Sequence, residues 1–503
     1  MPAPAPLRLS KSKFVAGLQC LKRLYFQVSQ PELASDVDEG QQAIFDQGHE
    51  VGVLAQSAYP GGVLVENGSD DLEAALARTA LLSRDPSIPA IFEATFFHFS
   101  VLVRADILQR RRRNRWRLIE VKSSVECKDH YLYDVAIQHH VLRGCGIDIS
   151  SSCLMHLNRE YVYGGQQHDL SRLFIIKDLT KRVAKLEEDL PKLLKAQQRA
   201  LEQDAPPDIA PGAHCLHPYT CEFFDRCNPA VDEDHVSRLP KLSEARTREL
   251  LDRGITQIQQ VPEDFPLTVI QDRVRSAVST GSAWTSGNLA EELSKLKYPR
   301  YYMDFESLYP AIPRHAGMRP YRHIPFQWSV HRQAEPGAEL EHFEFLADDA
   351  GDPRREFTRG LCEALGGRGP IVVYNAGFES QRLSELALWL PEFGVRIGKI
   401  QDRLWDLLAF VRQHLHHPEF HGSYSLKSVL PALVPSLTYD RMEVAHGDDA
   451  GLAWDRMIRG GLDIAERQRL RSALLKYCGQ DTLAMVKVMK QLRKYSGASS
   501  ASS

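Results

Sequence analysis

A chain of 503 residues is too long to fold around a single hydrophobic core, so we expect two or three domains. The residue pattern changes at three points along it. We expect an N-terminal domain in residues 1–230, a helical linker in 231–296, a C-terminal domain in 297–495 and a disordered Ser/Ala-rich tail in 496–503. Both domains mix strand-like and helix-like patterns, which predicts the α/β fold class for each.

The composition is that of an ordinary soluble protein, with 43% hydrophobic and 25% charged residues. No apolar run reaches the ~18 residues of a membrane span, and residues 1–8 lack the apolar region of a secretory signal. We therefore expect a cytoplasmic protein with no membrane partner. The sequence contains no G-x-x-x-x-G-K-[ST] loop of a helicase, so any unwinding would need a partner protein.

Nine cysteines are too sparse for a disulfide scaffold, and in a reducing compartment a local group of them indicates a metal site. Such a group occurs at Cys215, Cys221 and Cys227. The cysteines without this spacing are expected to be core residues: Cys127, Cys145, Cys153, Cys362 and Cys478.

A net charge of -3 excludes a protein coated in positive charge, so contact with nucleic acid has to come from local patches. The strongest patch is residues 104–128, where nine Lys or Arg residues face three acids. Its centre is the turn formed by Arg110, Arg111, Arg112 and Arg113, a candidate nucleic-acid-binding surface. The alternative is a solvated hairpin tip.

In the N-terminal domain, VRADILQRRRRNRWRLIEVKSS predicts two strands, residues 100–108 and 117–122, joined by that turn. Alternation along a strand places Glu120 and Lys122 on one face, and Asp106 lies on the partner strand. Two carboxylates facing each other form the oxygen-rich site that Mg²⁺ or Mn²⁺ prefers. A cation there can activate water, and the Lys122 ammonium can orient that water or stabilise the transition state of phosphodiester cleavage. The alternative is an ordinary exposed strand with charged residues.

This arrangement resembles the PD-(D/E)xK nuclease superfamily, and more closely its RecB-like branch, which includes the CRISPR-adaptation nucleases. The resemblance implies a restriction-endonuclease-like fold for this domain. It also implies a metal-site histidine at His49, on an early helix, and a catalytic-site glutamine at Gln138, on the helix after the second strand. The tyrosine usual four residues after the glutamine is Leu142 here.

The cysteines extend the same resemblance. RecB-like iron-sulfur nucleases place one ligand at the start of the domain and three after it, as Cys20 and the trio in HCLHPYTCEFFDRC are placed here. The resemblance implies a 4Fe-4S cluster that clamps the two ends of the domain together. Zinc is the alternative, and iron-sulfur is favoured because paired C-x-x-C knuckles are absent from the sequence.

Apolar residues at helical spacing predict one long helix over residues 170–203, ended by the proline-rich stretch 205–211. Short helices then follow in residues 237–281. The Gly254-Ile255 step between two of them resembles a helix-hairpin-helix element, which binds phosphate through backbone amides. A plain helical spacer is the alternative.

The C-terminal domain carries a second set of acids. We expect strands at 301–305, 327–332, 342–346 and 371–374, a helix at 354–365, and mainly helices after these. Asp304 and Glu306 alternate on the first strand, so both project to one side, and Glu379 follows the last strand at the start of a helix. Tyr477 and Asp481 lie four residues apart on one helix face. Four converging acids can hold two divalent cations, and a phenol beside the last acid can position the attacking water.

The order D-x-E, N-A-x-F-acid and Y-x-x-x-D resembles the DEDD exonucleases of the RNase H-like fold, in the tyrosine subtype. Asp406 and Leu426 fall where such domains carry their intermediate helices. The second motif normally supplies Asp, and here it is Glu379, whose extra methylene puts efficient two-metal catalysis in question. A non-catalytic domain of the same fold is the alternative.

The whole chain also resembles a bacterial family that fuses a RecB-like nuclease to this C-terminal domain, through MDFESLYPAIPRHAGMRPYRHIPFQWSVH. We expect the loop 310–325 to lie near Glu306, with its arginines on substrate phosphates or packed against the sheet. The function implied is a DNA nuclease in repair, recombination or defence, with a possible helicase or defence-system partner. The alternatives are a nucleic-acid-binding scaffold and an RNA-processing exonuclease.

Overall fold

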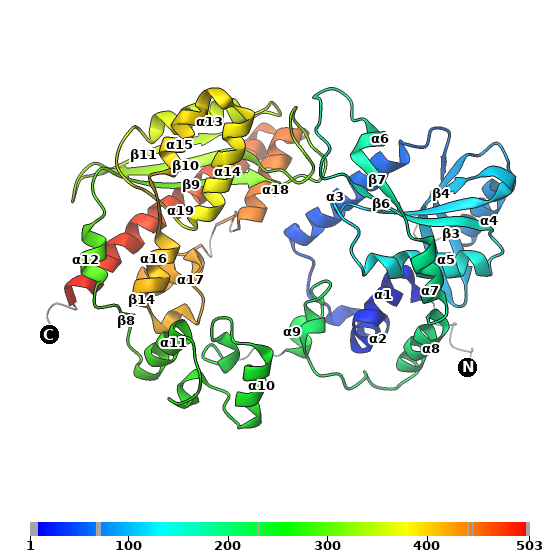
Figure 1. Ribbon diagram of the computed structural model, residues 1–503, viewed down its shortest axis with the longest axis horizontal. Coiled ribbons are helices and arrows are strands. Elements are labelled where there is room, and N and C mark those ends of the chain that lie inside the picture. The colour runs from blue at the N-terminus through cyan, green and yellow to red at the C-terminus, as the bar shows by residue number, and fades with distance from the viewer. Residues whose placement is uncertain (1–8, 67–71, 229–231, 440–441, 445, 499–503) are drawn as a thin grey trace. The chain divides into compact units, whose positions relative to one another are not determined.

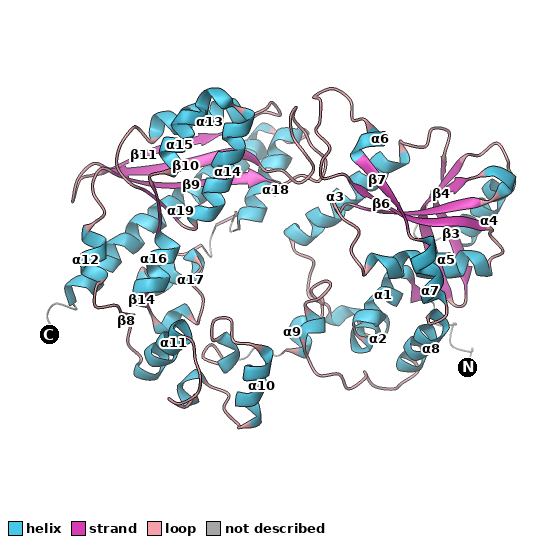
Figure 2. Cartoon of the chain, in the orientation of Figure 1, coloured by secondary structure: helices cyan, strands magenta, loops and turns pink. Residues whose placement is uncertain are grey.

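The computed structural model describes residues 9–66, 72–228, 232–439, 442–444 and 446–498. The chain divides into two compact units (Figure 1). The first comprises Met1–Ala230 and Pro310–Arg322, and the second comprises Val231–Tyr309 and His323–Ser503. Each unit combines a sheet with helices, which confirms the α/β class (Figure 2). None of the helices in the described ranges has the length and apolarity to cross a membrane.

The first unit is built on a seven-stranded sheet in the order β2-β3-β4-β5-β6-β7, with β1 paired to β4. The strands are β1 (Leu9–Ser10), β2 (Val63–Leu64), β3 (Ala90–His98), β4 (Val101–Arg110), β5 (Trp116–Lys122), β6 (Ile149–Leu157) and β7 (Phe174–Asp178). The antiparallel pair β4-β5 is the hairpin expected from the sequence, and β5 continues into a parallel pair with β6.

Helices cover both faces of this sheet. They are α1 (Lys11–Gln19), α2 (Leu21–Ser29), α3 (Glu39–Gln56), α4 (Leu72–Arg84), α5 (Tyr131–Gly144), α6 (Leu170–Leu173), α7 (Thr180–Glu187), α8 (Leu190–Leu201) and α9 (Phe224–Cys227). Residues of α1, α2, α4, α5, α7 and α8 share one apolar core with the sheet, and α3 contributes Val51 and Ala55 to a second core. Adjacent residues Leu118 and Ile119 belong to the first and second core respectively, because side chains alternate along β5.

The single long helix expected over residues 170–203 is wrong. The segment contains α6, strand β7, α7 and α8, and β7 pairs antiparallel with β6. Phe174, Ile175 and Ile176 are residues that favour strands over helices. Pro191 stands in the first turn of α8, where a missing N–H is tolerated, so a new helix starts there instead of continuing α7.

The segment expected as a linker, residues 231–296, lies within the second unit. It contains α10 (Glu244–Asp252), α11 (Val269–Thr280), α12 (Leu289–Ser294) and β8 (Trp284–Thr285), and β8 pairs with β14 (Leu415–His416). After Gly254, at φ 75°, the chain forms a bridge between His235 and Gln257 and a 3-10 turn at Ile258–Gln260. A helix-hairpin-helix element has its second helix at this position, whereas this chain has only the short 3-10 turn.

The second unit is built on a five-stranded sheet in the order β11-β10-β9-β12-β13. The strands are β9 (Arg300–Leu308), β10 (Ile324–Gln333), β11 (Leu340–Leu346), β12 (Ile371–Val373) and β13 (Leu404–Asp406). Strand β10 runs antiparallel to β9 and β11, whereas β12 runs parallel to β9 and β13. Strand β13 was not expected, because the sequence pattern predicted mainly helices after residue 374.

Helices lie on both faces of the second sheet. They are α13 (Arg354–Ala364), α14 (Ala376–Trp389), α15 (Gly394–Gln401), α16 (Leu407–His414), α17 (Leu426–Leu433), α18 (Gly447–Arg459) and α19 (Ile464–Ala498). Tyr301, Met303 and Phe305 of β9 pack into a core with α13, α14 and α15. The alternate residues Asp304 and Glu306 therefore lie on the opposite face, which α18 and α19 contact. Helix α19 includes the first three residues of the expected tail, and 499–503 lie outside the described residues.

The loop Pro310–Arg322, between β9 and β10, groups with the first unit. Its backbone pairs with Tyr163, which donates to Met318 O at 2.9 Å and accepts from Gly317 N at 2.9 Å. Ala311 is buried in the core that contains Val51. The loop is thus a segment of 13 residues, between two strands of the second unit, that packs with the first unit.

Candidate functional site

A cluster of opposite charges surrounds Glu120 in the first unit. Glu120 is 1% exposed, on the sheet face that α1 and α5 cover. Lys11 Nζ, at the start of α1, lies 2.8 Å and 2.9 Å from its two carboxylate oxygens. Lys122 Nζ lies 2.9 Å from Glu120 Oε1 and 2.8 Å from Asp134 Oδ2. Gln138 Nε2 donates to Glu120 Oε2 at 2.6 Å. Glu120 is thus held by two ammonium groups and one amide.

Asp106 completes this cluster from β4. Its Oδ2 accepts a 2.7 Å hydrogen bond from the N–H of Val121, and its Oδ1 lies 3.9 Å from Lys11 Nζ. The ladder between β3 and β4 passes from the pair Phe92 and Ile107 to the pair Ala94 and Ala105, skipping Asp106 and Glu93. Glu93 has a φ of 54°. Such a local departure from strand geometry redirects side chains and is typical of functional sites.

The two central carboxylates differ in ionisation. Burial opposes the charge on Glu120, but the ammonium groups of Lys11 and Lys122 outweigh it and hold the pKa of Glu120 well below its usual range. Burial, together with the neighbouring Glu120 carboxylate, raises the pKa of Asp106 to about 7. Burial also raises the pKa of Glu93.

Sequence reasoning named some of these residues and missed others. The structure brings Asp106, Glu120, Lys122 and Gln138 together, and Gln138 acts on Glu120 as a positioning residue. His49 is exposed on α3. It acts to lower the pKa of Glu93, against the effect of burial. Lys11, Glu93 and Asp134 were not predicted, because nothing local in the sequence links them to Glu120.

The four cysteines of the expected cluster line one small cavity: Cys20, Cys215, Cys221 and Cys227. None of these four cysteines forms a disulfide. Gln19, beside Cys20, donates to His214 O at 2.7 Å and to Tyr219 O at 2.8 Å, which ties the end of α1 to the cysteine loop. Asp304, Glu306 and Cys478 form the one group of three His, Cys, Asp or Glu side chains among the described residues with ligand atoms within 4.8 Å of one another. No three of the four cavity sulfurs are therefore that close.

Arg110, the first residue of the arginine turn, contacts the protein itself. Arg110 donates to Leu82 O at 3.2 Å, Ser83 O at 3.0 Å and Asp85 O at 2.6 Å, and it lies over the Trp116 ring. It thereby satisfies carbonyls at the C-terminal end of α4, so its head group is committed to the fold. The side chains of the next three residues are exposed: Arg111, Arg112 and Arg113. The turn stands roughly 20 Å along β5 from Lys122, at ~3.3 Å per residue.

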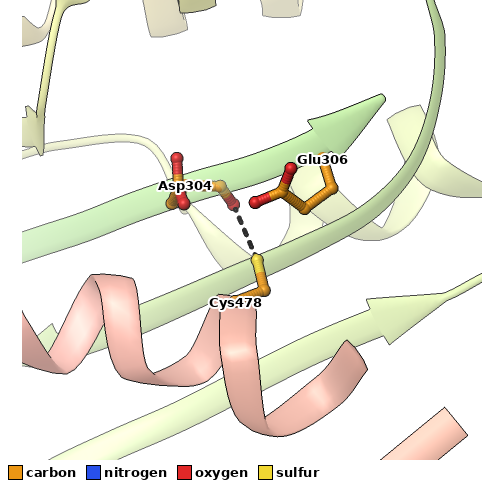
Figure 3. A group of neighbouring side chains, drawn as sticks. All are labelled: Asp304, Glu306 and Cys478. Atoms are coloured by element: carbon orange, nitrogen blue, oxygen red, sulfur yellow. Dashed lines mark hydrogen bonds between the residues drawn. The ribbon is translucent and has the colours of Figure 1, made fainter. Parts of the chain in front are cut away.

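An open pocket of about 300 Å³ lies in the second unit, where β9 and β12 end. The five candidate residues of this unit all line it: Asp304, Glu306, Glu379, Tyr477 and Asp481. Parallel strands β9 and β12 bring the ends of two motifs to one edge, and α14 starts there after Asn375 at φ 99°. Ligands of open α/β sheets bind at this kind of edge. Figure 3 shows Asp304 and Glu306 on β9 above Cys478 on α19.

The pocket holds more negative charge than its walls compensate. Burial, with the charges of Asp481 and Glu306, raises the pKa of Asp304 well above its usual range. Burial raises the pKa of Glu379 to about 8 and that of Asp481 to about 6. Glu379 is 3% exposed, and its Oε2 has no hydrogen-bond partner among the described residues. A divalent cation would relieve both the charge and the missing partner.

Two aromatic hydroxyls approach Asp481. Tyr439 donates a hydrogen bond to Asp481 Oδ1, and Tyr477, one turn before Asp481 on α19, lines the same pocket. Burial and Asp481 raise the pKa of both phenols well above the usual range, so both stay protonated donors. Lys427 lines the same pocket. Sequence reasoning missed Tyr439, and it missed Lys427 although it named the neighbouring Leu426.

Residues 301–425 match the model of a family described as a domain of unknown function (DUF2779). The chain is 25% identical over 223 residues to Uncharacterized protein UU173 of Ureaplasma parvum serovar 3, which covers 40% of this chain and 32% of that relative. The match thus spans about a third of the relative's length. The crystal structure of SSO0001 is similar at 14% identity over 41% of this chain and 80% of that chain, with a TM-score of 0.18.

Proposed function

We propose that this chain is a metal-dependent nuclease with two active sites that hydrolyses phosphodiester bonds of DNA. The observation that carries the proposal is the pocket of the second unit, where four carboxylates and the Tyr477 hydroxyl converge. Its strand order and motif order favour an RNase H-like exonuclease of the DEDD tyrosine subtype, trimming from 3′ ends. RNA is a possible second substrate of the same chemistry.

The residues of this pocket fit divalent cations. The donors are carboxylate oxygens, as Mg²⁺ and Mn²⁺ require, and Glu379 Oε2 is buried without a partner. Asp304, Glu306, Glu379 and Asp481 would hold the metal, which supplies activation of water and stabilisation of the leaving 3′ oxygen. Tyr477 lines the pocket one helical turn before Asp481 and can orient a water molecule beside it. Lys427 brings a positive charge to the pocket wall, where a substrate phosphate would lie.

The first unit is proposed as a PD-(D/E)xK nuclease of the RecB-like branch. Asp106 and Glu120 provide the carboxylates for Mg²⁺ or Mn²⁺, and Gln138 orients Glu120 by its 2.6 Å hydrogen bond. Lys122 holds its ammonium 2.9 Å from Glu120, beside the place where charge develops on a phosphodiester. Lys11 lies between the same two carboxylates, so a cation can bind there only if Lys11 moves away.

The four cysteines are proposed to hold a 4Fe-4S cluster. Zinc with four thiolates holds the sulfurs about 3.8 Å apart, from its ~2.3 Å bonds in tetrahedral geometry. No three of the four sulfurs lie within 4.8 Å of one another, although all four line one cavity. A cluster of several atoms holds its ligands farther apart than a single ion does, which supports iron-sulfur over zinc.

The test is cleavage of end-labelled single- and double-stranded DNA and RNA with Mg²⁺ or Mn²⁺. Asp304→Ala should abolish 3′ trimming, and Lys122→Ala should abolish a separate activity, because each removes one site. The exposed residues Lys195 and Asp349 provide matched controls as Lys195→Ala and Asp349→Ala. If both site variants cut every substrate as well as wild type does, the proposed function is wrong.

A second candidate applies to the first unit alone: binding of nucleic acid without cleavage. The observation that favours it is the seating of Lys11 on both oxygens of Glu120. Under this alternative, Lys122→Ala changes no cleavage product, and the first unit still retains DNA in a binding assay.

A further inference from the structure

We propose that Asp304, Glu306 and Cys478 form a site for a thiophilic divalent cation, of which Zn²⁺ is the type case. This deepens the proposed function of the acidic pocket, because two of the three ligands are shared with it. The third is a cysteine that the sequence pattern predicted to be a core residue only.

The geometry brings the three side chains to one point. Their ligand atoms, one from each residue, lie within 4.8 Å of one another. Asp304 and Glu306 project from β9, and Cys478 reaches the same point from α19, where its Sγ donates to the Asp304 carbonyl oxygen at 3.7 Å (Figure 3). Zinc bonds of ~2.0–2.3 Å hold neighbouring ligand atoms up to roughly 4 Å apart, so a small side-chain rotation closes the group around an ion.

A second observation points to a cation in this pocket. Glu379 lines it, is 3% exposed, and has its Oε2 without a hydrogen-bond partner among the described residues. A cation beside Asp304 would also offset the negative charges that Asp304 faces from Glu306, Glu379 and Asp481.

The donor set decides which cation binds best. Carboxylates alone suit Mg²⁺ and Mn²⁺, whereas a thiolate selects Zn²⁺ and other softer ions. Two carboxylates and one sulfur leave a fourth position for water, as in zinc sites with three protein ligands. The Cys478 thiol must release its proton to solvent when the ion binds, so binding releases protons.

Zinc at this site should inhibit trimming. Asp304 and Glu306 cannot serve Zn²⁺ and the Mg²⁺ or Mn²⁺ of the proposed reaction at the same time in the same geometry. Zn²⁺ binds nitrogen, oxygen and sulfur ligands more tightly than Mn²⁺ does, so low concentrations of zinc should displace manganese.

The test uses Co²⁺ as a spectroscopic substitute for Zn²⁺ in the full chain. The wild type should show a sulfur-to-cobalt charge-transfer absorption that Cys478→Ser lacks. Cys362→Ser is the matched control, because Cys362 lies in the same unit on α13 and outside the pocket lining. Absorption from the other four-cysteine cavity is common to all variants and cancels in the difference spectra.

Two further measurements complete the test. Glu306→Gln keeps Cys478, so it should keep the sulfur band but bind Co²⁺ at least tenfold more weakly. This variant also covers the case in which Cys478→Ser does not fold. The Zn²⁺ concentration for half-inhibition, relative to each variant's own rate with Mn²⁺, should rise at least tenfold in Cys478→Ser.

The outcomes separate this site from the proposed function. Identical cobalt spectra in wild type and Cys478→Ser overturn the site, even if the chain trims DNA. A sulfur band that depends on Cys478, in a chain that trims no substrate, supports the cation site and refutes the trimming activity proposed for the second unit.

Discussion

Replacing Lys11 by methionine tests how much the Lys11 ammonium group stabilises the buried carboxylate of Glu120. Lys11 donates to both oxygens of Glu120, at 2.8 Å and 2.9 Å, and its side chain is 23% exposed. Methionine keeps an unbranched apolar stem and removes only the ammonium group. Glu120 would retain Lys122 at 2.9 Å and Gln138 at 2.6 Å.

The expected loss of stability follows from these contacts. Removing one partner of a buried ion pair lowers the free energy of unfolding by about 3–5 kcal/mol when the remaining charge has no other partner. Glu120 keeps two partners, so the loss should be nearer that of one charged hydrogen bond, about 2 kcal/mol. For a domain of the size of the first unit, this loss lowers the midpoint temperature of thermal unfolding by about 4–8 °C.

Manganese should reverse the effect. Lys11 no longer competes for Glu120 and Asp106 in the variant, so Mn²⁺ should bind at least tenfold more tightly and add about 1.4 kcal/mol more stability than in wild type. Calorimetry with and without Mn²⁺ measures this, and hydrogen exchange of β4 and β5 assigns the transition to the first unit. Lys13→Met is the control, because Lys13 forms no ion pair in the described part of the chain. Equal stabilisation of wild type and variant by Mn²⁺ would refute the reasoning.

Three further predictions concern other residues. Burial raises the pKa of Glu379 to about 8, so the stability contributed by its protonated form is fully present below about pH 4.5 and is lost as the pH rises to about 8. Urea unfolding without divalent cations should show this loss in wild type and in the exposed control Glu356→Gln, but not in Glu379→Gln. Cys20→Ser should lower iron content and destabilise the first unit in anaerobically purified protein, and normal iron content would contradict the cluster. Arg110→Ala should destabilise by about 1–2 kcal/mol in chemical unfolding, whereas exposed Arg112→Ala should stay within about 0.5 kcal/mol.

The parts of the site that the sequence predicted correctly follow from the local periodicity of strands and helices. Asp304 and Glu306 are two residues apart on a strand, so their side chains share a face whatever else the chain does. Tyr477 and Asp481 are four apart on α19 and meet on one helix face for the same kind of reason. These short-range relations survive folding unchanged.

Local periodicity could not predict contacts between residues that are far apart in the sequence. Lys11 and Glu120 are 109 residues apart, and Lys11 arrives only because β1 pairs with β4 at the centre of the sheet. Cys478 and Asp304 are 174 residues apart, and their contact depends on how α19 packs against β9. No pattern within either segment specifies such pairing.

The prediction of one long helix over residues 170–203 was wrong for a different reason. Val183, Leu186, Leu190 and Leu194 do lie on core-facing positions of α7 and α8. Their spacing continues across the break between the two helices, so periodicity alone could not reveal it. The proline at position 191 was the local signal of a new start.

The two candidate sites stabilise a buried glutamate in opposite ways. Glu120 and Glu379 are 1% and 3% exposed, so both lose the hydration that stabilises a carboxylate. Two ammonium groups contact Glu120, and its pKa stays well below the usual range. Asp406 is the charge that acts on Glu379, and burial with this like charge raises the pKa of Glu379 to about 8. A metal that binds at Glu120 therefore has to displace an ammonium group, whereas a metal that binds at Glu379 has to displace a proton.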